Sequence, residues 1–83
     1  MPGMIYVYIL QSDSDKGYYI GISKDLNSRL KKHNSGEVRS TAKRKPFKII
    51  YSEKFEDYFS ARIREKEIKS YKGGNSFKQL IGS

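Results

Sequence analysis

Five side chains that could act together on a phosphate ester are spread over four segments of this chain. Tyr8 and Tyr19 fall in two short segments near the start, and Arg29 and His33 follow four residues apart. Glu65 lies far along the chain. A carboxylate can hold a divalent cation, an arginine can clamp a phosphate, and a phenol or imidazole can orient or deprotonate water. If folding brings these residues together, they predict a site that attacks a phosphodiester.

The first half of the chain predicts a hairpin followed by a helix. Residues 5–10 are apolar on both faces and predict an inner strand, and residues 18–22 return as the second strand after a polar turn. Ser23 is a suitable N-cap for a helix over residues 24–35, which Gly36 ends. This helix carries Arg29 and His33 on one side, beside its apolar stripe.

The second half predicts one more strand and two helices. Residues 47–52 alternate as a third strand, Asp57 can cap a helix that stops near residues 73 and 74, and Asn75 can cap a short final helix. The order β-β-α-β-α-α predicts an α/β (α+β) fold with a three-stranded, mainly antiparallel sheet packed on helices. The length of 83 residues predicts one domain, over residues 4–82.

Glu65 is the unusual member of an apolar helix face. At about 100° per residue, the second helix directs Glu65 inward. The other members of this face are Tyr58, Ala61 and Ile68. A carboxylate placed there needs hydrogen bonds, a cation or a metal, because an unpaired buried charge costs several kcal/mol. The simpler alternative is an exposed pair with Lys69, worth about 0.3 to 0.5 kcal/mol.

The charge balance predicts a polyanionic partner. Seventeen Lys and Arg residues against nine Asp and Glu residues give a formal charge of +8. Nucleic acid is favoured over a membrane, because no basic amphipathic stretch resembles a membrane anchor and no apolar run is long enough to span one. The chain has no cysteine, which excludes disulfides and thiolate metal cages and is usual in a reducing cytoplasm.

Four motifs, taken in order, resemble the GIY-YIG nuclease family, in particular its short single-domain bacterial members. They are Val7-Tyr8-Ile9, Tyr19-Ile20-Gly21, Arg29 with His33, and the segment from Arg64 to Lys69. The first motif departs from the family name, because Tyr6 stands where the name has glycine and Val7 where it has isoleucine. The likeness spans nearly the whole chain, from about Met4 to Ile81.

The resemblance implies a nuclease in which water attacks a metal-bound phosphate. It matches Tyr8 and Tyr19 to the two motif tyrosines and Gly21 to the closing glycine. Arg29 and His33 match the helix arginine and the histidine after it, Glu65 matches the metal-binding glutamate, and Asn75 is a candidate for the late active-site asparagine.

Phosphodiester chemistry suggests a role for each matched residue. Glu65 would hold Mg²⁺ or Mn²⁺, and Arg29 would clamp the phosphate as charge builds on its oxygens. Tyr19 would act as the base with help from His33, and Tyr8 would orient water or phosphate. Each residue also has a purely structural alternative: strand tyrosines often belong to the core, and an Arg and a His four residues apart often form a surface pair.

A basic run between the two longer helices predicts contact with phosphates rather than with bases. Its members and their neighbours are Lys31, Lys32, Arg39, Lys43, Arg44, Lys45 and Lys48. Such a run can also be a solvated loop. Because no recognition helix is evident, we expect weak sequence specificity.

We therefore predict a metal-dependent endonuclease that hydrolyses DNA phosphodiester bonds, with branched or damaged DNA and cytoplasmic DNA repair as its expected setting. The main alternative is a noncatalytic nucleic-acid-binding module on the same scaffold. A protein-interaction module whose charge is incidental is a third possibility.

Overall fold

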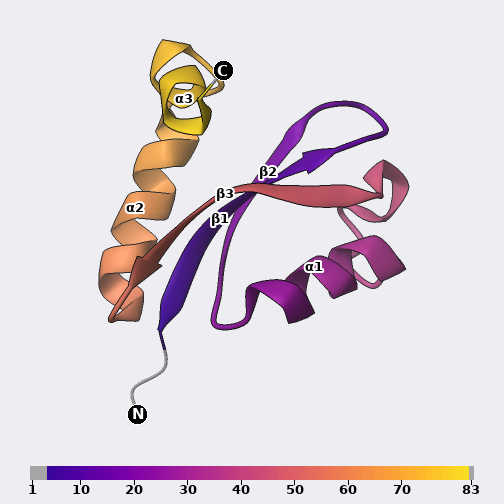
Figure 1. Cartoon of the computed structure of the whole chain (residues 1–83), viewed down its shortest axis with the longest axis horizontal. Coiled ribbons are helices and arrows are strands. Elements are labelled where there is room, and N and C mark those ends of the chain that lie inside the picture. Colours follow the sequence, from indigo (N-terminus) through magenta and orange to yellow (C-terminus); the bar gives the residue numbers. More distant parts are fainter. Residues whose placement is uncertain (1–3, 83) are drawn as a thin grey trace.

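An antiparallel sheet lies between helices that cover both of its faces (Figure 1). The computed structural model describes residues 4–82. The strands are β1 (Ile5–Ser12), β2 (Tyr18–Ser23) and β3 (Phe47–Phe55), in the spatial order β2-β1-β3. The helices are α1 (Leu26–Ser35), the short 3₁₀ helix η1 (Ala42–Arg44), α2 (Tyr58–Ser70) and α3 (Asn75–Ile81). The predicted element order and the α+β fold class are confirmed.

Strand β1 is the inner strand, as its apolar sequence predicts. Val7 and Ile9 pack in the cluster that α2 and α3 cover, whereas Tyr8 and Leu10 pack in the cluster that α1 covers. All four side chains are at most 2% exposed. Because alternate residues of a strand point to opposite faces, β1 presents its tyrosine to the α1 side of the sheet.

Aspartates cap both longer helices. Asp57 caps α2, as predicted. The predicted start of α1 was wrong by two residues, because Asp25 rather than Ser23 is the N-cap: its carboxylate accepts a hydrogen bond of 3.1 Å from the Ser28 amide. Ser23 instead accepts one from the Asp25 amide and shapes the approach to the helix. No helix in the described part of the chain has the length and apolar character needed to cross a membrane.

The last helix begins without a side-chain cap, which contradicts the prediction for Asn75. Gly74 occupies the N-cap position and Asn75 is the first helical residue, with its side chain exposed. Helix α2 also ends at Ser70, a few residues before the glycines that were expected to end it. The turn between α2 and α3 therefore uses backbone hydrogen bonds, including one from the Gly74 amide to the Tyr71 carbonyl.

An ion pair holds α2 against β3. The Arg64 guanidinium lies 2.9 Å from the Glu53 carboxylate on β3, which also accepts a hydrogen bond of 2.5 Å from the Tyr51 hydroxyl. Arg64 further pairs with Glu67, one turn along α2. Because consecutive helix residues are about 100° apart, this anchor also helps to set the direction in which the next residue, Glu65, points.

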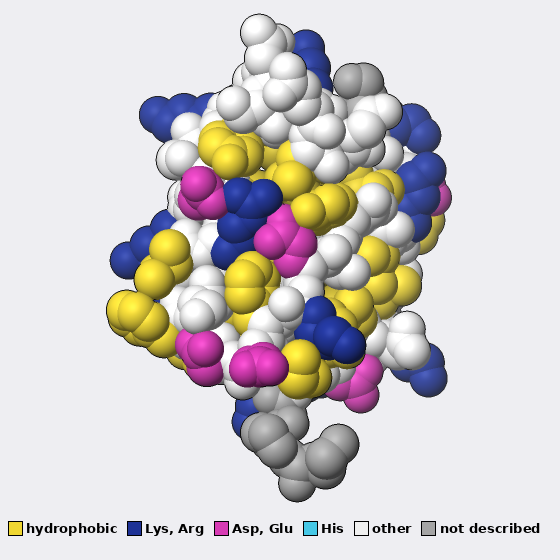
Figure 2. All heavy atoms as spheres, turned by 60° about the vertical axis from the view of Figure 1, so that its left-hand side comes forward, with side chains coloured by type: hydrophobic (Ala, Val, Ile, Leu, Met, Phe, Trp, Pro, Cys, Tyr) yellow, Lys and Arg dark blue, Asp and Glu magenta, His cyan; other side chains and the backbone are white. Residues whose placement is uncertain are grey.

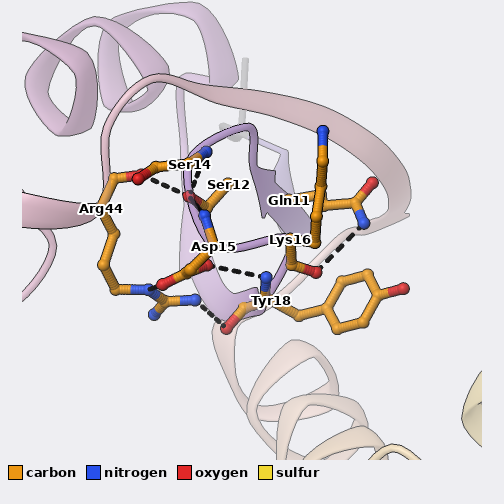
Figure 3. Close-up of polar contacts among 8 residues, drawn as sticks. Gln11, Ser12, Ser14, Asp15, Lys16, Tyr18 and Arg44 are labelled. Carbon is orange, nitrogen blue, oxygen red and sulfur yellow. Dashed lines mark hydrogen bonds and ion pairs between the residues drawn. The ribbon is translucent and has the colours of Figure 1, made fainter.

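The β1–β2 turn is tied to the loop that precedes β3 (Figure 3). The buried Ser12 hydroxyl donates to the Arg44 carbonyl and accepts from the Ser14 and Asp15 amides. The Arg44 side chain in turn donates to the Asp15 carboxylate at 2.8 Å and to the Tyr18 carbonyl at 3.3 Å. These contacts make the turn and the loop one unit, which we call the hairpin lock.

Ser12→Ala is expected to lower the free energy of unfolding by about 1–3 kcal/mol, because it removes the donor to the part-buried Arg44 carbonyl. Urea denaturation measures the change. Ser14→Ala is the matched control and should be nearly neutral, since Ser14 joins the lock through its backbone amide. Equal destabilisation by the two variants would contradict a central role for the Ser12 hydroxyl.

Candidate active site

Two tyrosines and the only histidine of the chain meet on the α1 side of the sheet. The Tyr8 hydroxyl lies 3.4 Å from His33 Nε2. The Tyr19 and His33 rings are 4.6 Å apart between centroids, and the two tyrosine rings are 6.4 Å apart. Tyr8 comes from β1, Tyr19 from β2 and His33 from α1. The structure thus brings together three predicted site residues from three elements.

Gly21 makes room for the Tyr8 hydroxyl. The two residues face each other across the β1–β2 ladder. A Cβ atom at position 21 would lie 2.5 Å from Tyr8 Oη and 2.7 Å from Cζ, closer than any side chain allows. Gly21 is therefore required by the close approach of a neighbouring ring rather than by an unusual backbone angle.

The charges of Arg29 and Glu65 both act on Tyr8. Burial raises the pKa of Tyr8 to about 12, the neighbouring Tyr19 and the Glu65 carboxylate add to the rise, and Arg29 opposes it. Arg29 lies on α1, one helical turn before His33, and Glu65 lies on α2. Tyr8 therefore remains a neutral phenol at pH 7.

His33 is held in its neutral form. The side chain is 1% exposed, and both its burial and the nearby Arg29 charge lower the pKa of the imidazole. A neutral imidazole has one nitrogen that donates and one that accepts a hydrogen bond. His33 can therefore serve as a proton acceptor at neutral pH.

Glu65 is buried, as its position on the helix predicts, and both of its oxygens are paired. Oε1 lies 2.7 Å from Arg62 Nη1, and Oε2 lies 3.1 Å from Lys69 Nζ. The glutamate side chain is 7% exposed, whereas those of Arg62 and Lys69 are 48% and 52% exposed. The pair with Lys69 thus exists, but it reaches a buried carboxylate instead of forming on the open surface.

The donor chemistry around Glu65 fits a hard, hydrated cation. Within residues 4–82 no group of three or more His, Cys, Asp or Glu side chains could form a cage for a metal ion. Mg²⁺ commonly binds one or two carboxylates and keeps several waters, so a single buried carboxylate is suitable. The side chains of Arg62 and Lys69 are flexible and half-exposed, and they could withdraw to admit such an ion.

A pocket of about 360 Å³ lies beside Arg29, between the starts of α1 and α2. Lys24, Asp25, Lys32 and Tyr58 also line it, so it combines three cationic side chains with one carboxylate and an aromatic ring. The expectation that Tyr58 belongs to the inward face of α2 was wrong, because 59% of this residue is exposed. The first residue of a helix can turn toward solvent without loss of core packing, and Tyr58 faces the pocket instead.

The predicted phosphate-contacting residues divide into two kinds. Six are exposed, on α1, in the loop after it and on β3: Lys31, Lys32, Arg39, Lys43, Lys45 and Lys48. Arg44 differs from them because its guanidinium belongs to the hairpin lock. We therefore assign Arg44 primarily to the fold, and contact of the other six with phosphate stays a prediction.

Asn75 lies on the side of the sheet that α3 covers. The ring of Phe77, two residues further along, is 4.9 Å from that of Tyr18 at the start of β2. This contact brings α3 close to the strand that carries Tyr19. Among the described residues the Asn75 side chain has no hydrogen-bond partner, and its membership of the site stays a prediction.

Sequence reasoning missed Thr41, which contacts His33 directly. Thr41 Oγ1 lies 2.8 Å from His33 Nδ1, and only 1% of Thr41 is exposed. Thr41 follows His33 by eight residues, in an irregular loop with no periodic pattern. Its sequence therefore contains no signal that it is buried.

The α2 side of the molecule shows charged and hydrophobic side chains intermixed (Figure 2). Phe59 is 74% exposed and Ile63 is 55% exposed, although both are large and apolar. These two residues lie one turn apart on α2, away from the face that carries Glu65. The outer surface of α2 is therefore more apolar than the solvent-facing side of a helix usually is.

Comparison with known proteins gives a consistent result. A family model described as the GIY-YIG catalytic domain matches residues 4–78. The UPF0213 proteins SA0446 and SAV0488 of Staphylococcus aureus, strains N315 and Mu50, are each 42% identical over 67 residues, or 80% of either chain. The solution NMR structure of UPF0213 protein BH0048 from Bacillus halodurans is similar, with a TM-score of 0.61 and 32% identity over 95% of this chain and 83% of that chain.

The fold, the clustered tyrosines and the family match together define a nuclease-type domain. The chain belongs to the GIY-YIG family, and within it resembles the short UPF0213 proteins. Membership supports a nuclease-type role and implies a nucleic-acid substrate.

Gly21→Ala should lower the free energy of unfolding by about 1–3 kcal/mol, because the added methyl group overlaps the Tyr8 ring. Chemical denaturation measures the loss. The same substitution in a Tyr8→Phe background should cost less, since the atom at 2.5 Å is then absent. An equal cost in both backgrounds would show that the Tyr8 hydroxyl is not what excludes a side chain from position 21.

Stability should decrease as the pH falls below about 6.5, the usual pKa of histidine. The folded-state pKa of His33 is lowered, so the unfolded chain binds a proton more readily, and folding loses free energy until the pH passes the folded-state value. Thermal denaturation between pH 7.5 and 5 tests this above the range in which most carboxylates titrate. His33→Gln should flatten the curve; an unchanged slope would exclude His33 as its cause.

Proposed function

We propose that this protein is a metal-dependent endonuclease that hydrolyses phosphodiester bonds in DNA. The observation that carries the proposal is the meeting of Tyr8, Tyr19 and His33. A hydrophobic core alone would not need two phenols and an imidazole in one place. The net charge of +8 suits a polyanionic substrate.

Arg29 is our candidate to bind the phosphate. It lines the pocket between α1 and α2 and also acts on the charge states of Tyr8 and His33. A guanidinium there can bind two phosphate oxygens and stabilise the negative charge that accumulates on them during attack. Lys24 and Lys32 extend the positive lining of the pocket, and so could hold the flanking backbone.

Tyr8 and Tyr19 differ in exposure, and we propose different roles for them. Tyr19 is partly exposed and packs against His33, so it is our candidate to orient or deprotonate the attacking water. Tyr8 is 2% exposed, and its pKa of about 12 makes it a poor base. Its hydroxyl instead holds His33 and fills the space above Gly21.

Glu65 would hold a Mg²⁺ or Mn²⁺ ion through its carboxylate, and the ion would neutralise charge on the phosphate when bound. The buried position of Glu65 suits this role because the carboxylate is fixed and little hydrated. The exposed lysines on α1 and the loop after it would follow the DNA backbone. We propose branched or damaged DNA as the substrate, within cytoplasmic DNA repair, in keeping with the lack of a recognition helix and of cysteine.

One observation favours a noncatalytic nucleic-acid-binding module as the second candidate. Both Glu65 oxygens are paired with cations of this chain, and these pairs could permanently replace a metal ion. In that case the fold would bind nucleic acid without turnover. The exposed Phe59 and Ile63 are the features that would suit a protein-interaction module.

Glu65→Gln is expected to abolish nicking of supercoiled or branched DNA in Mg²⁺ or Mn²⁺ while leaving DNA binding within about twofold, because the amide keeps the shape but loses the charge that binds the ion. Agarose-gel cleavage and fluorescence anisotropy measure the two properties. Glu56→Gln, an exposed acid before α2, is the control and should cleave normally.

Full cleavage by Glu65→Gln would exclude the metal role. Salt-sensitive binding without cleavage by the wild type, under either metal, would favour the binding module. Binding that is absent, or insensitive to salt, would exclude both nucleic-acid functions.

A further inference from the structure

A buried chain of hydrogen bonds runs from Tyr8 through His33 to the loop after α1. The Tyr8 hydroxyl is 3.4 Å from His33 Nε2, and His33 Nδ1 is 2.8 Å from Thr41 Oγ1. The Thr41 hydroxyl is 3.3 Å from the Val38 carbonyl. Tyr8, His33 and Thr41 are each at most 2% exposed, so these groups must satisfy one another.

The Tyr8 hydroxyl favours one direction for the chain. Tyr8 is buried, and among the described residues its hydroxyl has His33 Nε2 as its single hydrogen-bond partner, so donation to Nε2 satisfies its proton. A bare Nε2 places the imidazole proton on Nδ1, from which Thr41 Oγ1 then accepts. The single proton of the Thr41 hydroxyl is left to donate to the Val38 carbonyl.

We propose that Thr41 is a positioning residue that holds His33 in the Nδ1–H tautomer and so fixes the direction in which Tyr8 donates its proton. Its importance for catalysis rests on the proposed nuclease function. With Tyr8 donating to it, His33 Nε2 is able to take up the Tyr8 proton. The opposite tautomer would turn Tyr8 into an acceptor from His33 and remove this capacity.

The loop that carries Thr41 is itself held in place. The Thr41 amide donates to the Val38 carbonyl at 3.1 Å, and the Arg44 amide donates to the Thr41 carbonyl at 2.9 Å. Arg44 belongs to the hairpin lock, so Thr41 is connected through the backbone to the β1–β2 turn. Thr41 also makes no side-chain cap for η1, which leaves its hydroxyl to His33 and Val38.

The tautomer can be measured directly because the chain has one histidine. In ¹⁵N-labelled protein at pH 7.5, a long-range ¹H–¹⁵N spectrum distinguishes a protonated ring nitrogen from a bare one. We expect the wild type to show protonated Nδ1 and bare Nε2. A wild-type spectrum with the proton on Nε2 would overturn the proposal without any variant.

Two variants test whether Thr41 is responsible. Thr41→Val keeps the shape but removes the hydroxyl, and it should move at least half of the histidine population away from Nδ1–H. Thr41→Ser keeps the hydroxyl and should retain the wild-type spectrum. If Thr41→Val folds, as judged by its backbone amide spectrum, and still shows only Nδ1–H, then Thr41 does not control the tautomer and the proposal fails. If Thr41→Val does not fold, the wild-type and Thr41→Ser spectra decide.

Kinetics separate this proposal from the proposed function. If the wild type cleaves DNA, Thr41→Val should lower kcat about tenfold with KM unchanged, the size of effect common for groups that orient a functional histidine. Thr41→Ser should restore kcat. An unchanged kcat in a variant with altered tautomer would refute the catalytic importance of Thr41. A wild type that never cleaves would refute the nuclease function, while the spectra would still decide the tautomer.

Discussion

The packing of one histidine against two tyrosines is the interaction on which this structure depends. His33 lies between β1, β2 and the loop after α1, and it is in contact with a residue from each. The imidazole must be buried, neutral and hydrogen-bonded at both nitrogens for this arrangement to be stable. Position 21 must be a glycine for the same reason, because the Tyr8 hydroxyl that contacts His33 occupies the space of a Cβ atom there. The fold and the candidate site therefore share one set of contacts.

The predicted site residues come in part from two helices on opposite sides of the sheet. Helix α1 supplies Arg29 and His33, whereas α2 supplies Glu65, held at the right rotation in part by the pairing of Arg64 with Glu53. The negative charge of Glu65 still affects Tyr8 on the other side.

Local sequence patterns predicted much of this fold, and prediction failed where tertiary contacts decide. Alternation and capping residues predicted the strands and the end of α1, and helical spacing predicted the burial of Glu65. The same spacing was wrong for Tyr58, because a helix terminus need not follow the face of its middle. Thr41 could not be predicted, since an irregular loop has no period that shows which of its hydroxyls is buried. Arg44 was predicted to contact phosphate, and its structural role was missed because its acceptors, Asp15 and the Tyr18 carbonyl, lie far back in the chain.

The two ion pairs on Glu65 mean that its buried negative charge is already compensated by Arg62 and Lys69 in the folded chain. Folding therefore needs no metal ion to compensate this carboxylate, unlike the folding of small domains whose core forms only around an ion. We expect the chain to stay folded in the presence of a chelator.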